Sequence, residues 1–352
     1  MLRTHSGARC APPTGAVVIE ALVLTGFLGS GKTTLLGHLL RQPQFSHTAV
    51  IINEFGEVGL DHDLIEASED SLIELATGCL CCKLRNDIAT TIHDLLWRRD
   101  QGKVTPFSRV VIETSGLADP APILQTLMTD PTIAARIAVA GVVATVDAVN
   151  GSDTLFREGI SIKQVALADR LVVTKADLAN GEQFSLVRRM RALNATAPIF
   201  YANYGEIDAR CLFDGTLHDA LLESLDVRLR LDTSAIASDH ADGGHDVNTF
   251  TILRREPIRA VALTLLLEAL SDHCGADLLR LKGIVNILES PDQPAVIHGV
   301  QHVFHPPSWL PRWPSDDRRS RIVFITRSVP RRWVEVLLDA IDAEVAAASS
   351  GQ

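Results

Sequence analysis

The chain has 352 residues, of which 46% are hydrophobic and only 5% aromatic, and its formal net charge at pH 7 is -10. A chain of this length usually forms two domains, each able to bury its own core. The acidic balance argues against a nucleic acid as the main partner, because neutralising phosphates requires a basic face. The sequence also lacks an apolar stretch that approaches a membrane span.

Two features indicate a cytoplasmic protein. Residues 1–15 contain Arg3 and Arg9 but no apolar core of signal-peptide length, so we expect a disordered tail there. The chain has six cysteines, which do not suggest a disulfide framework at this length, and Cys81 and Cys82 are adjacent. Their Cα atoms are about 3.8 Å apart across a trans peptide, closer than ordinary disulfide geometry allows, so reduced thiols are expected.

A nucleotide-binding motif lies near the N-terminus. It follows an apolar run at 17–24 that predicts a β-strand, and it precedes a helical pattern that begins at Thr34. It matches G-x-x-x-x-G-K-[ST] and reads Gly26-Phe27-Leu28-Gly29-Ser30-Gly31-Lys32-Thr33. In such a loop backbone N–H groups turn toward the nucleotide phosphates, Lys32 reaches the β and γ oxygens, and the Thr33 hydroxyl is placed for Mg²⁺. The pattern therefore predicts a phosphate-binding loop.

Short apolar runs alternate with helical patterns from about residue 17 to about residue 213. Several runs are nearly continuous in valine and isoleucine, which is typical of strands buried on both faces of a sheet. The expected strands are 17–25, 48–53, 109–114, 138–147, 170–174 and 198–202. This order predicts an α/β fold, a P-loop NTPase with a mostly parallel central sheet.

A cluster of three cysteines, in Gly78-Cys79-Leu80-Cys81-Cys82, lies between the phosphate loop and the strand expected at 109–114. Three sulfur ligands suit Zn²⁺ or Cu⁺ and would also accept Co²⁺ or Ni²⁺. A closed zinc site needs a fourth ligand, and the loop at 53–62 offers Glu57 first and Glu54 or His62 next. The alternative is that these cysteines pack in the core as small apolar residues.

An acidic residue ends the strand expected at 109–114. Glu113 begins the sequence Glu113-Thr114-Ser115-Gly116. In a P-loop fold a carboxylate at the end of a neighbouring buried strand is where a second Mg²⁺ ligand belongs, directly or through water. Gly116 would let a backbone N–H approach the γ-phosphate. We therefore expect Lys32, Thr33 and Glu113 to form the catalytic group, with a helix-capping role as the alternative for Glu113.

The sequence Thr174-Lys175-Ala176-Asp177 follows the strand expected at 170–174. It resembles the guanine motif N-K-x-D, with threonine in the first place. Asp177 can accept hydrogen bonds from the ring N–H and the exocyclic amino group of guanine, an arrangement that adenine cannot match. Lys175 would pack its stem over the base, so the motif predicts a guanine nucleotide.

The composition changes at 232–247 to polar and small residues without periodicity, which predicts a flexible linker. Beyond it, strands near 250–253, 279–287, 295–304 and 321–326 accompany helices at 259–274 and 330–347, which indicates a small α+β domain with one helix-covered sheet. We expect a nucleotide-binding domain at 16–231, a C-terminal domain at 248–347 and a tail at 348–352. In the second domain His298 and His302 form either a ligand pair or part of an exposed sheet face.

These segments together resemble the ordered motif set of the CobW-type GTPases. The resemblance rests on the phosphate loop through Thr34, Asn53-Glu54-Phe55-Gly56-Glu57, the cysteine motif, the segment from Glu113 to Pro120, and Thr174-Lys175-Ala176-Asp177. The second domain resembles that of the family at Leu279-Arg280-Leu281-Lys282-Gly283 and Gly299-Val300-Gln301-His302. The cysteine motif is the specific part, because it separates this group from the nickel-handling maturation GTPases, which share the fold.

The resemblance implies a GTP-dependent metallochaperone, most often for zinc, that delivers its metal to a client protein. It puts the metal site on Cys79, Cys81 and Cys82, and the nucleotide site on 26–34 with Lys175 and Asp177. Zn²⁺ would be cargo, and Mg²⁺ would accompany GTP. Turnover should be slow, because the sequence shows no obvious water-positioning glutamine or stimulating arginine.

Two other functions share these motifs. One is a cobalt inserter for cobalamin or nitrile hydratase pathways, and the other is a nucleotide-responsive metal-binding regulator that delivers nothing. The expected partners are GTP or GDP and a client metalloprotein, without nucleic acid or membrane, and a homo-oligomer is compatible with each function.

Overall fold

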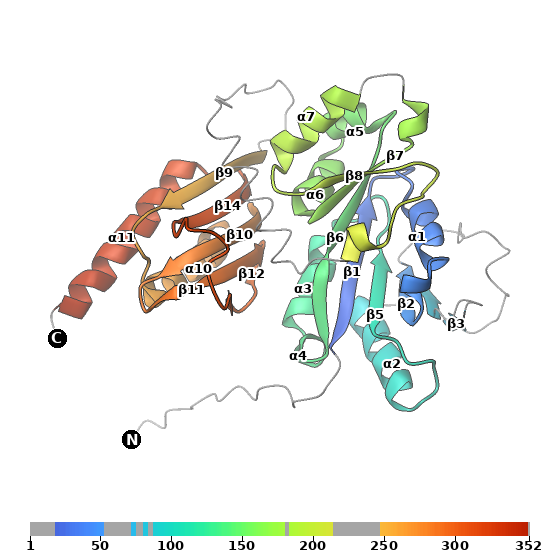
Figure 1. Ribbon diagram of the computed structural model, residues 1–352, viewed down its shortest axis with the longest axis horizontal. Helices are drawn as coiled ribbons and strands as arrows, with labels where there is room; N and C mark the ends of the chain where they lie inside the picture. Colours follow the sequence, from blue (N-terminus) through green and yellow to red (C-terminus); the bar gives the residue numbers. More distant parts are fainter. Residues whose placement is uncertain are drawn as a thin grey trace.

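The computed structural model describes residues 18–52, 72–74, 80–83, 87–179, 183–213 and 247–350, with the backbone alone for 72–74, 80–83 and Ser350. The expected N-terminal tail, the loop at 53–62 and the linker up to residue 246 lie outside the described residues. The described chain forms two domains, each built on one sheet (Figure 1).

The first domain contains an eight-stranded sheet in the order β3-β4-β2-β5-β1-β6-β7-β8. Neighbouring strands are parallel except β3, which runs antiparallel to β4. The strands are β1 (Ile19–Gly26), β2 (Thr48–Ile52), β3 (Leu72–Glu74), β4 (Leu80–Lys83), β5 (Arg109–Glu113), β6 (Ile137–Asp147), β7 (Arg170–Thr174) and β8 (Ile199–Ala202). The expected P-loop NTPase architecture with a mostly parallel sheet is confirmed.

Helices cover both faces of this sheet, because its central strands are apolar on both sides. Side chains alternate along a strand, so Leu22 and Leu24 meet α1, whereas Ala21 and Val23 belong to the core on the opposite face. The first face carries α1 (Lys32–Leu40), the short 3-10 helix η1 (Pro43–Phe45) and α8 (Arg210–Phe213). The second face carries α2 (Ile88–Asp100), α3 (Ala121–Thr129), α4 (Pro131–Ala134), α5 (Gly151–Arg157), α6 (Gly159–Leu167) and α7 (Gln183–Leu193).

The second domain contains a six-stranded antiparallel sheet in the order β12-β11-β10-β14-β9, with β13 paired to β11. The strands are β9 (Val247–Arg254), β10 (Leu278–Ile287), β11 (Ser290–Val300), β12 (Val303–Phe304), β13 (Ser308–Trp309) and β14 (Ser320–Arg327). Two helices, α10 (Ala260–Cys274) and α11 (Arg331–Ser350), pack on one face of it. This is the expected sheet covered by helices.

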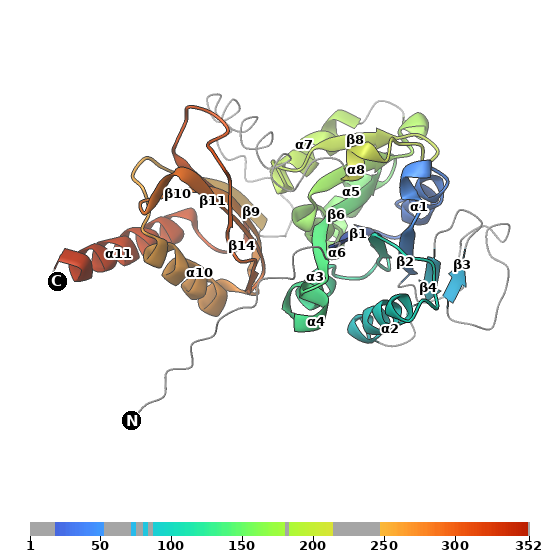
Figure 2. The ribbon, with the colours of Figure 1, turned by 60° about the horizontal axis from the view of Figure 1, so that its bottom comes forward.

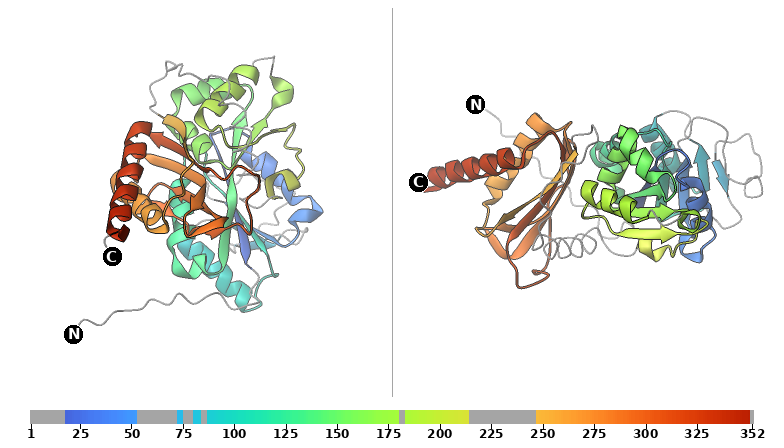
Figure 3. Two further views of the ribbon diagram at one scale, coloured as in Figure 1. Left: turned by 60° about the vertical axis from the view of Figure 1, so that its left-hand side comes forward. Right: turned by 90° about the horizontal axis from the view of Figure 1, so that it is seen from above.

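The opposite face of the second sheet lies against the first domain, as Figures 2 and 3 show. Helices α3, α6 and α7 make this contact with strands β9 to β12. Its apolar part is a small buried cluster of Ala166, Leu279 and Ile325. A side-chain hydrogen bond of 2.7 Å joins Gln125 of α3 to Gln301, which follows β11. Among the described helices, none combines the length and the apolarity that a bilayer crossing requires.

The structure differs from the sequence-based expectation in several places. The single strand expected at 295–304 is divided into β11 and β12, because the chain reverses at Gln301, which has φ 53°. Strands β3 and β4 were not expected, and β4 contains Cys81 and Cys82, for which the sequence predicted no strand. These strands are too short to show a period of their own; β4 is held by pairing with β2, and β3 by pairing with β4. Val247, expected in the linker, begins β9, and α11 extends to Ser350, three residues into the expected C-terminal tail.

Candidate nucleotide and metal site

The phosphate loop connects β1 to α1. Gly26 has φ 143° and lies so close to β6 that a Cβ atom there would be 2.3 Å from the Thr145 hydroxyl oxygen, so no other residue fits. Gly31, with φ 86° in the left-handed region, caps the N-terminus of α1. The sharp reversal at these two glycines leaves the N-terminus of α1 directly after the loop, which is the usual geometry of a phosphate site.

Lys32 is the first residue of α1, and its side chain returns to the loop. Its Nζ donates to the carbonyl oxygens of Gly26 at 2.9 Å and Phe27 at 3.1 Å. Only 5% of the residue is exposed. A buried ammonium held against the phosphate loop supplies a positive charge where the phosphates of a nucleotide would bind.

Glu113, the third expected catalytic residue, lies next to Thr33, the second. Thr33 Oγ1 donates to Oε1 of Glu113 at 2.7 Å, and Glu113 is completely buried at the end of β5, which pairs with β1. A hydroxyl and a carboxylate are hard oxygen donors of the kind that Mg²⁺ prefers. The residues present therefore fit a magnesium ion bound together with a nucleotide.

The turn after Glu113 packs on the phosphate loop. A Cβ atom at Gly116 would lie 2.7 Å from the backbone nitrogen of Leu28, so glycine is required for this approach. From the other side, Gln164 of α6 donates through Nε2 to the carbonyl oxygens of Gly116 and Ala118, each at 3.2 Å. The turn that the sequence assigns to the γ-phosphate is thus held between the phosphate loop and α6.

The guanine motif is tied to the same loop. Thr174 Oγ1 donates to the Ser30 carbonyl at 2.8 Å, and Lys175 Nζ donates to the Gly29 carbonyl at 2.8 Å. Lys175 has φ 56° and precedes a 3-10 helix, η3 (Ala176–Leu178), that contains Asp177. These contacts put Thr174, Lys175 and Asp177 beside the phosphate loop, where the base of a bound nucleotide would be reached.

The structure adds Asp147, whose functional position the sequence analysis did not single out. Its Oδ2 pairs with Lys175 Nζ at 2.8 Å, and its Oδ1 accepts from the Val149 amide at 2.7 Å. Burial alone would raise the pKa of Asp147, but the Lys175 ammonium and the backbone donors outweigh it and hold the pKa below its usual value. The pattern that indicated Glu113, an acidic residue at the end of a buried strand, would also have indicated Asp147. A cavity of about 130 Å³ lies between Asp147, Lys175 and the phosphate loop.

Two residues of the cysteine motif, Cys81 and Cys82, lie on the sheet that carries the phosphate loop. In β4, Cys81 and Cys82 are in register with Val50 and Ile51 of β2, and Ile51 is in register with Ile112 of β5. Strands are about 4.8 Å apart, so the backbone of Cys82 lies about 10 Å from β5, one residue before Glu113. Cys79 and Glu57 lie outside the described residues.

Comparison with known proteins gives two family matches. The model of the CobW/HypB/UreG nucleotide-binding domain matches residues 20–201, and the model of the cobalamin synthesis protein cobW C-terminal domain matches residues 247–342. This chain belongs to the CobW family. Zinc chaperone YjiA from Escherichia coli is 35% identical over 312 residues, covering 89% of this chain and 95% of YjiA. Zinc chaperone CobW from Pseudomonas aeruginosa is 30% identical over 342 residues, covering 87% of each chain.

Solved structures agree with this family. The crystal structure of Zn(II)-bound YjiA GTPase from Escherichia coli matches with a TM-score of 0.71 and 30% identity, covering 92% of this chain and 99% of that chain. A Zn(II)-bound variant of YjiA, with one glutamate and two cysteines replaced by alanine, matches with a TM-score of 0.72. The shared architecture of this CobW-family chain and YjiA therefore includes both domains.

The histidines of the C-terminal domain do not form the ligand pair considered from the sequence. His298 is half-buried in β11 with its ring edge-on to His305, the ring centroids being 6.4 Å apart, and His302 lies beyond the end of that strand. Burial, together with the charges of Lys282 and Arg280, lowers the pKa of His298 to about 3. Within the described ranges, no group of three or more His, Cys, Asp or Glu side chains is arranged to hold a metal ion.

Proposed function

We propose that this protein is a GTP-hydrolysing metallochaperone that holds zinc at Cys79, Cys81 and Cys82 and transfers it to a client metalloprotein. The proposal rests on the order of strands in the first sheet. It joins the strand of Cys81 and Cys82 through one intervening strand, β2, to the strand that ends in Glu113. The names of the relatives, zinc chaperones YjiA and CobW, support the choice of metal.

The nucleotide site supports hydrolysis of GTP to GDP and phosphate. A water oxygen attacks the γ-phosphorus while the bond to the β,γ-bridging oxygen breaks, so the residues must stabilise charge on the phosphate oxygens. Lys32 supplies a positive charge there, and backbone N–H groups of the loop and α1 orient the phosphates. Thr33 and Glu113 would hold Mg²⁺, which neutralises charge on the β and γ oxygens when bound. Intrinsic turnover is slow unless a client completes the site.

Base selection is assigned to the guanine motif. The Asp177 carboxylate accepts from guanine, while Lys175 is held between Gly29 and Asp147 and lays its stem across the base. ATP lacks the matching donors. Substituting Asp177→Asn should weaken GTP and favour xanthosine triphosphate, because the acceptor becomes partly a donor.

We assign the zinc to the thiolates of Cys79, Cys81 and Cys82. These thiols stay reduced if the protein is cytoplasmic. Three sulfur ligands and one carboxylate, for which Glu57 is the first candidate, complete a tetrahedral zinc site. Transfer then requires that the client offer competing ligands, because a closed site releases zinc slowly. A homo-oligomer is compatible with this mode of action.

The proposal is tested by binding and turnover measurements on the full chain. We expect the purified protein to bind GTP and GDP but not ATP, to hydrolyse GTP slowly, and to bind one equivalent of zinc in preference to cobalt under a competing chelator. Equal affinity for ATP and GTP would contradict the guanine assignment. Preference for cobalt under the same chelator would favour the inserter function instead. Because a YjiA variant lacking two cysteines still crystallised with Zn(II), stoichiometry must be measured together with affinity.

A further inference from the structure

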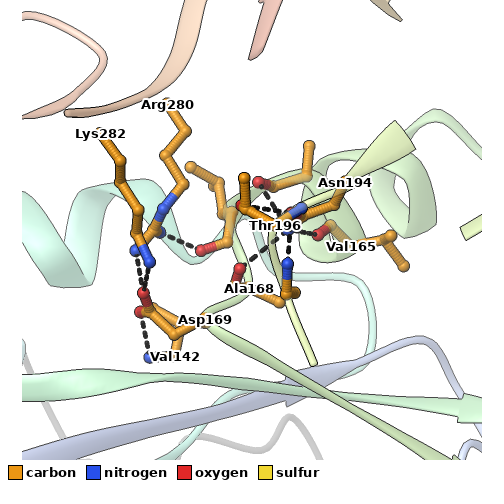
Figure 4. Close-up of polar contacts among 11 residues, drawn as sticks. Val142, Val165, Ala168, Asp169, Asn194, Thr196, Arg280 and Lys282 are labelled. Atoms are coloured by element: carbon orange, nitrogen blue, oxygen red, sulfur yellow. Dashed lines mark hydrogen bonds and ion pairs between the residues drawn. The ribbon is translucent and has the colours of Figure 1, made fainter. Parts of the chain in front are cut away.

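A buried ion cluster joins the two domains (Figure 4). The carboxylate of Asp169, between α6 and β7, contacts both Arg280 and Lys282 of β10. Its second oxygen accepts from the Val142 amide at 2.8 Å. The exposed side-chain fraction is 2% for Asp169, 8% for Arg280 and 6% for Lys282. Charges buried this deeply must stay paired, so the cluster fixes β10 against the start of β7.

The same cluster fixes the C-terminal end of α6. Arg280 donates to the carbonyl oxygen of Leu167, the last residue of this helix. Asn194, directly after α7, donates to the carbonyl oxygens of Val165 and Ala168, each at 2.8 Å (Figure 4). The end of α6 is therefore held from the second domain as well as from its own domain.

Residues earlier in α6 hold the turn at 116–119. Gln164, which is 1% exposed, makes both of its amide hydrogen bonds to this turn, at Gly116 and Ala118. The neighbouring Lys163 pairs with Asp119 through Nζ and Oδ2 at 2.9 Å. One helix thus connects the turn beside the phosphate loop to a contact with the second domain.

We propose that Gln164 is a positioning residue for GTP hydrolysis, and that the second domain supports it through Asp169, Arg280 and Lys282. The inference rests on the proposed function, because it assumes that the Gly116 turn meets the γ-phosphate. Gln164 fixes that turn, and the ion cluster fixes the helix that carries Gln164. GDP has no γ-phosphate, so its binding depends little on this arrangement.

The experiment compares hydrolysis with GDP binding in variants of the full chain. Gln164→Leu removes both donors at similar volume, and we expect kcat for GTP to fall about tenfold or more, since small misplacements near a reacting group have effects of this size. Lys282→Met leaves the Asp169–Arg280 pair balanced, so the fold should persist, with a smaller fall in kcat. The GDP dissociation constant should change by less than about twofold in both variants, because the phosphate loop is intact.

A matched control breaks a contact between the domains that does not involve α6. Thr249 Oγ1 of β9 donates to the Leu193 carbonyl of α7 at 2.9 Å, and Thr249→Val removes that bond. We expect wild-type kcat in this variant. A fall equal to that of Lys282→Met would overturn the specific role of α6, because any loosening between the domains would then suffice.

Two further results would overturn the inference. The first is wild-type kcat in both Gln164→Leu and Lys282→Met. The second is an equal loss of GDP binding and turnover, which would indicate general damage to the site. If Gln164→Leu does not fold, Gln164→Asn, with its shorter amide, makes the same comparison. A wild-type chain that hydrolyses no GTP would refute the proposed function itself, so the two failures are distinguishable.

Discussion

Single contacts around the phosphate loop determine what this site can do. A 2.7 Å hydrogen bond joins Thr33 to Glu113, although Thr33 lies in α1 and Glu113 ends β5, 80 residues further along the chain. The sequence could indicate Glu113, because a strand-end carboxylate is visible as a pattern. It could not indicate Gln164, because nothing in the local sequence shows that this side chain reaches the carbonyl groups of a turn 46 and 48 residues away.

Lys32→Ala is expected to abolish GTP hydrolysis with little loss of folding. The lysine compensates phosphate charge, and water can solvate the carbonyl groups of Gly26 and Phe27 that it now bonds. Turnover in a phosphate-release assay, with thermal unfolding as the control for folding, measures this. Normal turnover would remove the phosphate-loop assignment.

Asp147→Asn is expected to weaken GTP and GDP about fivefold, corresponding to roughly 1 kcal/mol for a partly exposed charged hydrogen bond. Asp147 fixes the Lys175 ammonium, so the substitution lets the lysine leave the base. The same change in a Lys175→Ala background should have almost no further effect, because the partner is already absent. Additive losses in this double-mutant cycle would show that Asp147 acts elsewhere.

His298 is expected to make the protein less stable as the pH falls below its ordinary pKa. In the unfolded chain the imidazole takes up a proton near pH 6.5, whereas in the folded chain its pKa is lowered to about 3. The unfolded state therefore binds more protons between these values, and the free energy of unfolding falls by up to about 1.4 kcal/mol per pH unit there. Urea unfolding of the wild type and His298→Gln at pH 7.5 and 5.5 measures it. A stability difference between the two proteins that does not change with pH would contradict this account.

At the scale of elements, continuous apolar runs in the sequence predicted the strands that are buried on both faces of a sheet. The six strands expected in the first domain correspond to β1, β2, β5, β6, β7 and β8 within a few residues, since continuous apolar runs identify buried parallel strands. Strands β3 and β4 were missed because three or four residues carry no period, and they form through pairing with distant segments, β4 with β2 and β3 with β4. That pairing places Cys81 and Cys82 of the cysteine motif in a strand of the sheet.

Single substitutions in that strand, Cys81→Ser and Cys82→Ser, are expected to weaken zinc binding by at least tenfold each. A hard hydroxyl replaces a soft thiolate, and a tetrahedral site loses one ligand. Cys211→Ser is the matched control, because Cys211 is a free cysteine of α8, outside the motif, and should leave zinc affinity unchanged. Zinc binding with wild-type affinity and stoichiometry in a variant lacking Cys79, Cys81 and Cys82 together would place the metal site elsewhere.

At the scale of the whole molecule, the residues proposed to bind the nucleotide and the zinc lie on one sheet, where the strands of Glu113 and of Cys81 and Cys82 are separated only by β2. The C-terminal end of β2 leads into the segment with Glu57, while β4 on one side of β2 carries Cys81 and Cys82, and β5 on the other side ends in Glu113. If GTP and Mg²⁺ order the segment that contains Glu57, the nucleotide and the metal bias the same element. Composition and motifs could predict two domains and two ligands, but not this adjacency, because strand order depends on pairing between distant segments.

This arrangement predicts that nucleotide and zinc binding are coupled. Coupling between binding sites is reciprocal, so the factor by which GTP changes zinc affinity must equal the factor by which zinc changes GTP affinity, typically corresponding to about 1–3 kcal/mol. The most direct measurement is competition with a chromogenic chelator in the presence of GDP or a non-hydrolysable GTP analogue. We predict that zinc is held more weakly, or passes faster to the chelator, in the GTP state. Identical zinc affinities and identical transfer rates in the two states would contradict the account and leave a GTPase whose metal binding is independent of its nucleotide.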